Sequence, residues 1–396
     1  MSKVDGTDKQ TIAGHLKNCG VSRRSFVQLC SMLMVAAPAG LALTENNPTP
    51  EKLAAKIGKA KRPSVIWLHF QDCTGCSESL LRTSKPDLAD LILNVISLDY
   101  HETLMAASGY QAEAALKTAV EENAGKFILV VEGSIPTKEQ GIYMKLAGKP
   151  ALDVLKEVGS KAFAVVSMGS CAAWGGVPSA GPNPTGAVGV DSIIKDKPVI
   201  NIPGCPPNPY TLLGTVLEVA ALGKVPALDD KKRPLFAYDR LIHDHCPRRA
   251  HFDAGRFATV FGDANHSKGY CLFKLGCKGP VTRNSCSTRH FNEIPDCWPI
   301  GIGAPCFGCS EQGVGYTIPA YETVQIHGVG GATPPDGYSL VGSTTGKIGV
   351  AAAGIVGLAA GAIGGAAWAA SQKLASSEEV TADVVDKKDV VSKGGR

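Results

Sequence analysis

The chain has 396 residues, which is enough for two or more domains with substantial cores. Its 40 Lys and Arg residues nearly balance 36 Asp and Glu residues, and this small net charge argues against a nucleic-acid-binding protein. Aromatic residues are scarce at 6%, whereas 45 glycines, 25 prolines and 13 cysteines are typical of a loop-rich protein that binds metal.

The N-terminal segment, residues 1–44, has the pattern of a signal peptide. The pair Arg23-Arg24 directly precedes an apolar stretch over 26–43 in which small residues are frequent. Paired arginines at this place favour the twin-arginine export route, which carries folded proteins. A chance Arg pair in an ordinary secretory signal or anchor is the alternative. The segment contains two cysteines that would be lost with the signal, Cys19 and Cys30.

After a linker over 45–60, the segment 61–240 alternates short apolar runs with stretches of helical character. Runs that are continuously apolar predict strands buried on both faces of a parallel sheet. The sequence therefore predicts an α/β fold with a doubly wound parallel sheet. The expected strands cover 64–70, 92–98, 127–131, 163–168 and 199–202, and two of the expected helices cover 112–124 and 151–161.

Four cysteines follow the ends of these predicted strands. Cys73 and Cys76 form a CxxC pair after the first strand, and Cys171 and Cys205 follow two later ones. Because open parallel sheets bind ligands beyond the carboxyl ends of their strands, we expect the four thiols to converge. Four thiolates suit a [4Fe–4S] cluster. A zinc site or buried free cysteines are the alternatives, although a zinc ribbon usually has two CxxC pairs and only one is present here.

The character of the sequence changes over 241–335, where regular hydrophobic periodicity fades and Cys, Gly and Pro dominate. Bound metal would therefore form much of the core of this segment. An H-x-x-C start and two further cysteines offer one imidazole and three thiolates for a second cluster. His245 competes with His243 for the imidazole position. The proposed ligands are His243, Cys246, Cys271 and Cys277.

A third set in the same segment has three cysteines, Cys286, Cys306 and Cys309. Three thiolates without a fourth suit a [3Fe–4S] cluster. Pro299 cannot act as a ligand, but Cys297 lies between the members of the set and can supply a fourth thiolate. Chemistry alone therefore leaves the cluster type open.

Two carboxylates near the first set are candidates for proton relay. Glu78 follows the CxxC pair, and Glu102 follows a predicted strand. Carboxylates beside a redox centre can transfer protons. A residue at a helix start or on the surface is the simpler alternative for both.

The C-terminal part predicts a membrane anchor. After a linker over 336–347, the stretch 348–370 contains no charged residue and is long enough to cross a bilayer as a helix. Glycines four residues apart would form one face on which another helix can pack. They are Gly357, Gly361 and Gly365. The tail 371–396 has mixed charge and is expected to be disordered.

Taken together, these segments resemble the small, electron-transferring subunit of membrane-bound, periplasmic [NiFe] uptake hydrogenases. The motifs that carry the resemblance run through nearly the whole chain and are DCTGCSES, LDYHE, VVEGSIP, GSCAAWGG, NPTGA, NIPGCPPNP, HDHC, LGCKGP and WPIGIGAPCFGC. The resemblance implies a flavodoxin-like domain over 61–240, a loop-rich cluster domain over 241–335, and a separate large subunit that holds the nickel–iron site.

By matching motif, the resemblance implies two [4Fe–4S] clusters and one [3Fe–4S] cluster. The first set would hold the proximal four-iron cluster, Cys286, Cys306 and Cys309 the medial three-iron cluster, and the set of His243 the distal four-iron cluster. Pro299 falls where the absent fourth medial ligand would be. Oxygen-tolerant relatives have two extra cysteines around the proximal cluster, at the places here assigned to Gly75 and Met144, which implies the oxygen-sensitive type.

The resemblance further implies that electrons from hydrogen oxidation reach a membrane acceptor, either a cytochrome b or another quinone-linked membrane subunit. The globular part would face the periplasm at the inner membrane. Two other classes of protein compete with this interpretation. One is a quinone-reductase-type subunit like the cluster-bearing subunit of respiratory complex I, which has a single cluster. The other is a secreted, disulfide-stapled or zinc-binding anchor protein without redox function.

Overall fold

The computed structural model describes residues 62–84, 88–291 and 294–326, all of which belong to one compact unit. The predicted signal (1–44), the linkers (45–60 and 336–347), the anchor (348–370) and the tail (371–396) lie outside these residues. Within the described ranges, no helix combines the length and apolar character needed to cross a membrane.

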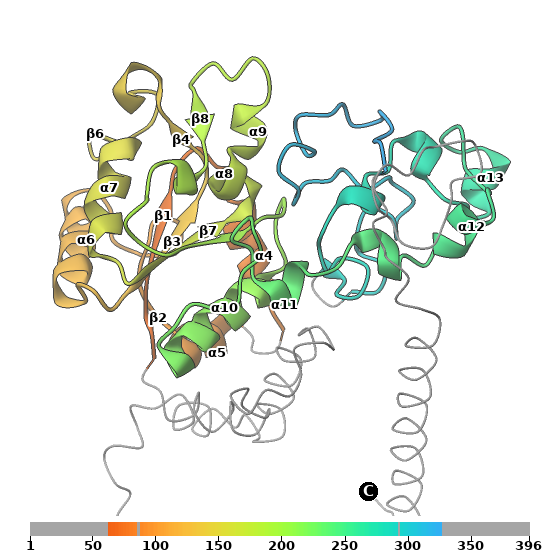
Figure 1. Cartoon of the computed structure of the whole chain (residues 1–396). Helices are drawn as coiled ribbons and strands as arrows, with labels where there is room; N and C mark the ends of the chain where they lie inside the picture. Colours follow the sequence, from red (N-terminus) through yellow and green to blue (C-terminus); the bar gives the residue numbers. More distant parts are fainter. Residues whose placement is uncertain (1–61, 85–87, 292–293, 327–396) are drawn as a thin grey trace, which may run out of the picture. The chain divides into compact units, whose positions relative to one another are not determined.

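Five parallel strands form the central sheet in the order β2-β1-β3-β7-β9 (Figure 1). The strands are β1 (Ser64–His69), β2 (Ser97–His101), β3 (Ile128–Glu132), β7 (Ala164–Met168) and β9 (Val199–Ile202). This is the flavodoxin-like order, whose switch point lies between β1 and β3. The predicted parallel α/β fold is confirmed.

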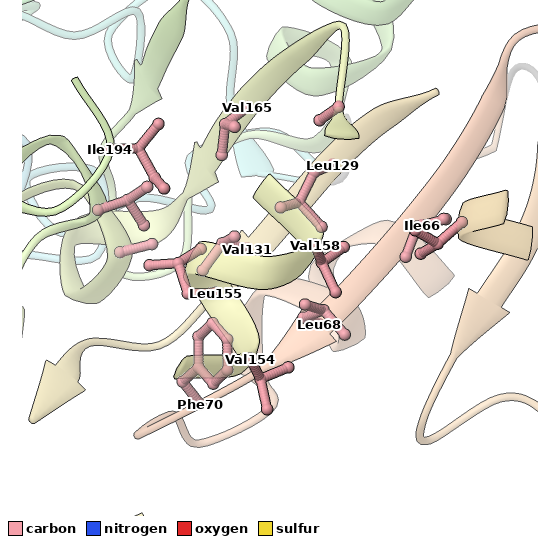
Figure 2. Close-up of a cluster of buried hydrophobic side chains, with 14 of the residues drawn as sticks. Ile66, Leu68, Phe70, Leu129, Val131, Val154, Leu155, Val158, Val165 and Ile194 are labelled. Carbon is pink, nitrogen blue, oxygen red and sulfur yellow. The ribbon is translucent and has the colours of Figure 1, made fainter. Parts of the chain in front are cut away.

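Both faces of the sheet are buried, as the continuously apolar runs predict. Along β1, Val65 and Trp67 belong to one core cluster, whereas Ile66 and Leu68 belong to another. The second cluster, drawn in Figure 2, is covered by α6 (Tyr110–Glu122) and α7 (Ala151–Lys161). The first is covered mainly by α10 (Pro209–Leu222). Alternate side chains of each strand therefore pack in opposite directions, and no strand needs a polar face.

One predicted strand is placed wrongly. The run expected over 92–98 forms a short π-helix, η2 (Leu91–Val95), and the strand β2 begins only at Ser97. Leu91, Val95 and Ile96 still enter the first core cluster. A short apolar run does not distinguish a buried helical turn from a buried strand, and burial of these side chains is satisfied in either form.

Shorter elements complete the α/β part. They are α4 (Gly75–Leu81), α5 (Leu88–Asp90), η3 (Lys138–Gly141), α8 (Gly169–Trp174), α9 (Gly176–Ser179), η4 (Val190–Ser192), α11 (Leu235–Tyr238) and two small antiparallel pairs, β4 (Ile135–Pro136) with β8 (Ala187–Val188) and β5 (Lys145–Leu146) with β6 (Lys149–Pro150).

From residue 241 to 326 the backbone forms only brief turns of helix, joined by loops and isolated bridges. Two small core clusters lie here, and the first includes Cys277 and Cys306 together with Trp298 and Ile300. Cysteines thus take positions that aliphatic side chains would fill in an ordinary core. The helical turns are η5 (Ile242–His245), α12 (Arg249–Asp253), α13 (Ala264–Ser267), η6 (Phe273–Leu275) and η7 (Gly279–Val281).

Candidate iron–sulfur sites

The CxxC loop after β1 is held by a carboxylate from the neighbouring strand. Thr74 adopts a left-handed conformation with φ 62°, and α4 begins directly after it without a side-chain cap. Glu132, at the end of β3 and 1% exposed, accepts hydrogen bonds from the backbone N–H groups of Cys76 (2.9 Å) and Ser77 (3.1 Å). A carboxylate at the N-terminus of a helix satisfies its free N–H groups and its dipole. Glu132 therefore fixes the position of the second CxxC cysteine.

The four thiols predicted at the sheet edge do converge. Burial raises the pKa of the Cys76 thiol well above its usual value, with further contributions from Glu132, Cys171, Cys205 and Cys73. Burial likewise raises the pKa of Cys171 to about 11, and Cys205 and Cys73 contribute to the increase. Such sulfurs become thiolates when a positively charged metal centre replaces the proton.

Two glycines leave the space that these sulfurs occupy. A Cβ atom at Gly169 would lie 2.5 Å from the Cys76 Sγ, and one at Gly176 would lie 2.6 Å from the Cys171 Sγ. Both glycines also have positive φ, at 89° and 52°. Only glycine combines this backbone conformation with so close an approach to a sulfur.

The spacing of the sulfurs fits a cluster better than a single zinc ion. Around one tetrahedral zinc the Sγ atoms would lie about 3.8 Å apart, because each Zn–S bond measures about 2.3 Å. Within the described ranges, one group of three or more potential metal ligands has all its donor atoms within 4.8 Å of one another. It consists of His69, Asp72 and Glu132 and contains no cysteine. The four sulfurs are thus spread more widely than one ion requires. That spread fits a cluster in which each thiolate binds a different iron.

The second predicted set lines a single pocket. Its walls include His243, Cys246, Cys271 and Cys277, and it encloses about 320 Å³ of atom-free space, part of it open to solvent. Burial raises the pKa of Cys271 to about 12 and that of Cys277 to about 11. Two buried thiols, the half-buried thiol of Cys246 and one imidazole therefore line the same space.

His243, and not His245, faces this pocket. The His243 side chain is 4% exposed, and its Nε2 atom has no hydrogen-bond partner among the described residues. Burial, together with Arg249, lowers its pKa to about 4, so the ring is neutral near pH 7, which is the form that binds metal. His245 is exposed. The competition that the sequence left open is therefore decided by burial.

The third set is partly buried, because Cys306 is buried and Cys286 and Cys309 are half-buried. Burial raises the pKa of Cys286 to about 12, with a contribution from Cys309, and raises the pKa of Cys306 well above its usual value, with contributions that include Cys309 and Cys286. The half-buried Cys297 is not among the groups that act on these thiols. The structure thus brings Cys286, Cys306 and Cys309 together, and the role of Cys297 stays a prediction.

The third set lies between the other two and contacts each of them. Toward the first set, the backbone N–H of Cys205 donates a hydrogen bond to the Cys309 sulfur, and Tyr316 donates its hydroxyl proton to the Cys205 sulfur. Ser170 connects the same loops, because its hydroxyl donates to the Cys309 carbonyl at 2.6 Å. Toward the second set, the Cys306 N–H donates to the Cys277 Sγ at 3.3 Å. The three sets therefore form a row.

Neither of the two carboxylates proposed for proton relay is the one that holds the CxxC loop, which is Glu132. Glu78 is exposed and pairs with Arg82 at 2.6 Å. Glu102 is half-buried, burial raises its pKa, and it accepts one long hydrogen bond (3.4 Å) from the His69 backbone. The roles of both stay predictions.

Sequence reasoning missed Glu132 and the polar network around it. Glu132 also accepts hydrogen bonds from the Ser77 hydroxyl (2.6 Å) and the Trp67 indole (3.2 Å). The same hydroxyl lies 3.1 Å from the His101 ring, and the Nδ1 atom of His69 contacts Asp72 at 2.5 Å. The available signal was an acidic residue at the end of a fully apolar strand, in the VVEGSIP motif, where a buried charge requires a specific purpose.

The structure adds a position beside the proximal thiols to the two that the resemblance indicates, and the assignment of Met144 stays a prediction. Met144 packs against the second core cluster. A Cβ atom at Gly75 would lie 3.1 Å from the Cys73 Sγ, whereas the close approach within the GSCAAWGG motif is at Gly176. The positions beside the proximal thiols are therefore glycines.

Two family models match the chain. One, described as NADH ubiquinone oxidoreductase, 20 Kd subunit, matches residues 73–219. The other, described as the C-terminal part of the NiFe/NiFeSe hydrogenase small subunit, matches residues 238–321. The first model covers the proximal set alone, and the second covers the two remaining sets.

Curated relatives match over most of the chain. The Hydrogenase-2 small chain of Escherichia coli K12 is 47% identical over 345 residues, which cover 87% of this chain and 90% of the relative. The periplasmic [NiFe] hydrogenase small subunit 1 of Nitratidesulfovibrio vulgaris is 47% identical over 77% of this chain and 94% of its own. An uptake hydrogenase small subunit of Rhizobium leguminosarum bv. viciae is 40% identical over 94% of this chain and 99% of its own.

Solved structures of hydrogenases are also similar to this chain. The [NiFeSe] hydrogenase of Desulfomicrobium baculatum matches with a TM-score of 0.59 and 36% identity over 63% of this chain and 95% of its own. An actinobacterial-type NiFe hydrogenase from Ralstonia eutropha H16 matches with a TM-score of 0.60 and 27% identity over 67% of this chain and 83% of its own.

Proposed function

Because this chain belongs to the family of [NiFe] hydrogenase small subunits, we propose that it carries electrons from hydrogen oxidation through three iron–sulfur clusters to a membrane acceptor. As a small subunit it pairs with a large subunit, which carries the active site. The row of three ligand sets is the observation that supports the proposal best.

The proposed ligand sets contain the same residues that the matching sequence motifs indicate. A proximal [4Fe–4S] cluster takes Cys73, Cys76, Cys171 and Cys205, a medial [3Fe–4S] cluster takes Cys286, Cys306 and Cys309, and a distal [4Fe–4S] cluster takes His243, Cys246, Cys271 and Cys277. When bound, such clusters supply reversible one-electron transfer at potentials set by ligand type, hydrogen bonds and burial.

The protein's own residues have three tasks in this scheme. The thiols and His243 hold iron in positions that the fold fixes. The apolar residues around the medial and distal sets, such as Trp298 and Ile300, exclude water from the medial and distal sulfurs. The hydrogen bonds from Cys205 to Cys309 and from Cys306 to Cys277 keep neighbouring sets in direct contact. None of these residues has to perform acid–base chemistry.

The experiment is an iron and sulfide determination with EPR on the anaerobically purified complex. We expect about eleven irons per small subunit, a three-iron signal in the oxidised protein and a nickel-containing partner. About twelve irons without that signal would replace the three-iron centre by a four-iron one. A colourless protein without iron would exclude the electron-transfer function.

For localisation, we propose that the globular part faces the periplasm and that the chain is anchored in the inner membrane beside a cytochrome b or another quinone-linked subunit. The support is the paired arginines before an apolar stretch and the uncharged stretch 348–370. Replacing Arg23 and Arg24 by Lys should leave precursor in the cytoplasm, and normal export would contradict the twin-arginine route.

Truncation after Gly346 should release a soluble heterodimer from membranes, as tested by fractionation.

A further inference from the structure

A lysine side chain is buried at the junction of the medial and distal sets. Lys278 has no exposed surface. Its Nζ atom donates hydrogen bonds to the carbonyls of Pro319 (2.9 Å) and Ala320 (3.0 Å), and a longer one to that of Gly276 (3.4 Å). The alkyl chain lies close to Gly308, where an added Cβ would be 3.1 Å from the Lys278 Cδ.

The surroundings of Nζ fit the charged form of this side chain. An ammonium group has three protons, and three carbonyl oxygens surround it. A neutral amine would donate only two protons and would direct its lone pair at a carbonyl oxygen. The amine also lies 5.9 Å from the centre of the Phe307 ring, a distance at which a cation is attracted to an aromatic face.

Within the described ranges Lys278 forms no salt bridge, and the one carboxylate that acts on its charge, Glu322, does so from beyond salt-bridge distance and less strongly than the nearby sulfurs. The contrast is Arg233, equally buried, which pairs with Asp229 at 2.7 Å and with Glu311 at 2.9 Å. A buried charge without a partner of opposite sign is costly. Because Glu322 forms no salt bridge with it, Lys278 would be stabilised further by negative groups of another kind.

The sulfurs of both adjacent sets are such groups. The charge of Lys278 interacts most strongly with the Cys306 sulfur, next with that of Cys277, and less with Glu322. The backbone joins the same residues, because the Lys278 N–H donates to the Cys306 carbonyl at 2.8 Å and the Cys306 N–H donates to the Cys277 Sγ. None of the four proximal cysteines is among the groups that interact with the Lys278 charge.

We propose that Lys278 is a positioning residue whose fixed positive charge raises the reduction potentials of the medial and distal clusters relative to the proximal cluster. Reduction adds a negative charge to a cluster, and a buried cation nearby stabilises the reduced form because water does not screen it. The uneven distribution of this charge along the row makes electron transfer away from the partner's active site more favourable. The proposal rests on the proposed function.

The test is an EPR-monitored redox titration of the intact heterodimer containing Lys278→Met or Lys278→Gln. Gln can still donate hydrogen bonds to the surrounding carbonyls but has no charge. We expect the medial and distal midpoint potentials to fall in both variants while the proximal potential is unchanged. The equilibrium constant for electron transfer from proximal to medial should fall at least tenfold, which is 59 mV for one electron.

Two further variants serve as controls. Lys278→Arg keeps the charge and should retain the wild-type potentials. Lys268→Met removes an exposed charge from the same segment and should shift none of the potentials.

Full cluster content with unchanged potentials in the Gln variant would overturn the proposal. Loss of clusters in the Met and Gln variants, but not in the Arg variant, would support a counter-charge needed during assembly. Loss in all three would mean that Lys278 only ties together the backbones at 276 and 319–320. Absence of clusters from the wild type would instead overturn the proposed function.

Discussion

At the scale of single residues, polar groups that touch the sulfurs distinguish one ligand set from another. Tyr316 lies between the proximal and medial sets, and its hydroxyl donates to the Cys205 sulfur. Hydrogen bonds to ligand sulfurs are among the factors that set cluster potentials. The cysteine motif alone contains no information about this donor, which comes from a turn more than a hundred residues further along the chain.

We expect Tyr316→Phe to lower the proximal midpoint potential, because the reduced cluster loses a donor that stabilises its extra charge. If a net hydrogen-bond energy of about 1 kcal/mol depends on the redox state, the shift is roughly 40 mV. EPR-monitored titration measures it. Tyr321→Phe, at an exposed tyrosine of the same segment, is the matched control and should leave all potentials unchanged. An unaltered proximal potential in Tyr316→Phe would show that the bond has no redox effect.

Cys297 offers a second test at this scale. Cys297 is not among the charges that raise the pKa of Cys286 or Cys306, and we expect Cys297→Ser to keep the three-iron signal and the iron content of the wild type. Cys306→Ser is the control and should abolish the medial signal, because its sulfur is buried at the centre of the row. A four-iron medial centre that becomes a three-iron centre in Cys297→Ser would identify Cys297 as a ligand.

At the scale of elements, the N-terminus of helix α4 depends on a residue of strand β3. Its N-terminus has no capping side chain of its own, and Glu132 at the end of β3 replaces one. Since β1 and β3 are neighbours in the sheet, the carboxylate reaches the loop that follows β1. The position of Cys76 thus depends on strand pairing as well as on the local CxxC sequence.

Glu132→Gln should therefore destabilise this loop. Glutamine has one carbonyl oxygen for donors that now share two charged oxygens, so at least one buried donor loses its partner, at a cost of about 1–3 kcal/mol. The expected result is a lower thermal midpoint and faster loss of the proximal cluster to an iron chelator, with medial and distal signals retained. Glu102→Gln removes only one long bond and should have a smaller effect. Equal effects of the two variants would contradict the capping role.

At the scale of the whole described molecule, a buried ion-pair network connects the α/β part with the loop-rich segment. Arg233 contacts Asp229 from its own segment, and Glu311 and the Ser310 carbonyl from the medial loop. Lys231 also pairs with Glu311. Because Cys309 precedes Ser310, this network holds the medial set against the sheet that bears the proximal set.

We expect Arg233→Met to destabilise the protein by about 3–5 kcal/mol, because it leaves Asp229 and Glu311 partly buried without the arginine. Differential scanning calorimetry of the loaded heterodimer should show a lower transition temperature, and limited proteolysis should cut the loop-rich segment first. Lys149→Met, at an exposed ion pair with Glu157, is the control and should leave the transition temperature nearly unchanged. Similar losses in the two variants would contradict a structural role for the network.

Much of the fold and the composition of the ligand sets could be predicted from the sequence. The strand at 199–202 and the helix at 151–161 agree with β9 and α7 to the residue, because hydrophobic periodicity and flanking Gly and Pro are local signals. The cysteines and the H-x-x-C start were recognised for the same reason. Ligand chemistry depends on residue type, which the sequence states directly.

Only the tertiary structure decided which groups meet. Contacts between residues far apart in the chain determine three features: the burial of His243 but not of His245, the central place of Glu132, and the burial of Lys278. The shifted start of β2 has the same origin, since both helical and extended backbones can bury Leu91 and Val95. Burial and proximity are properties of packing, and packing at the ends of parallel strands is set by which strands become neighbours.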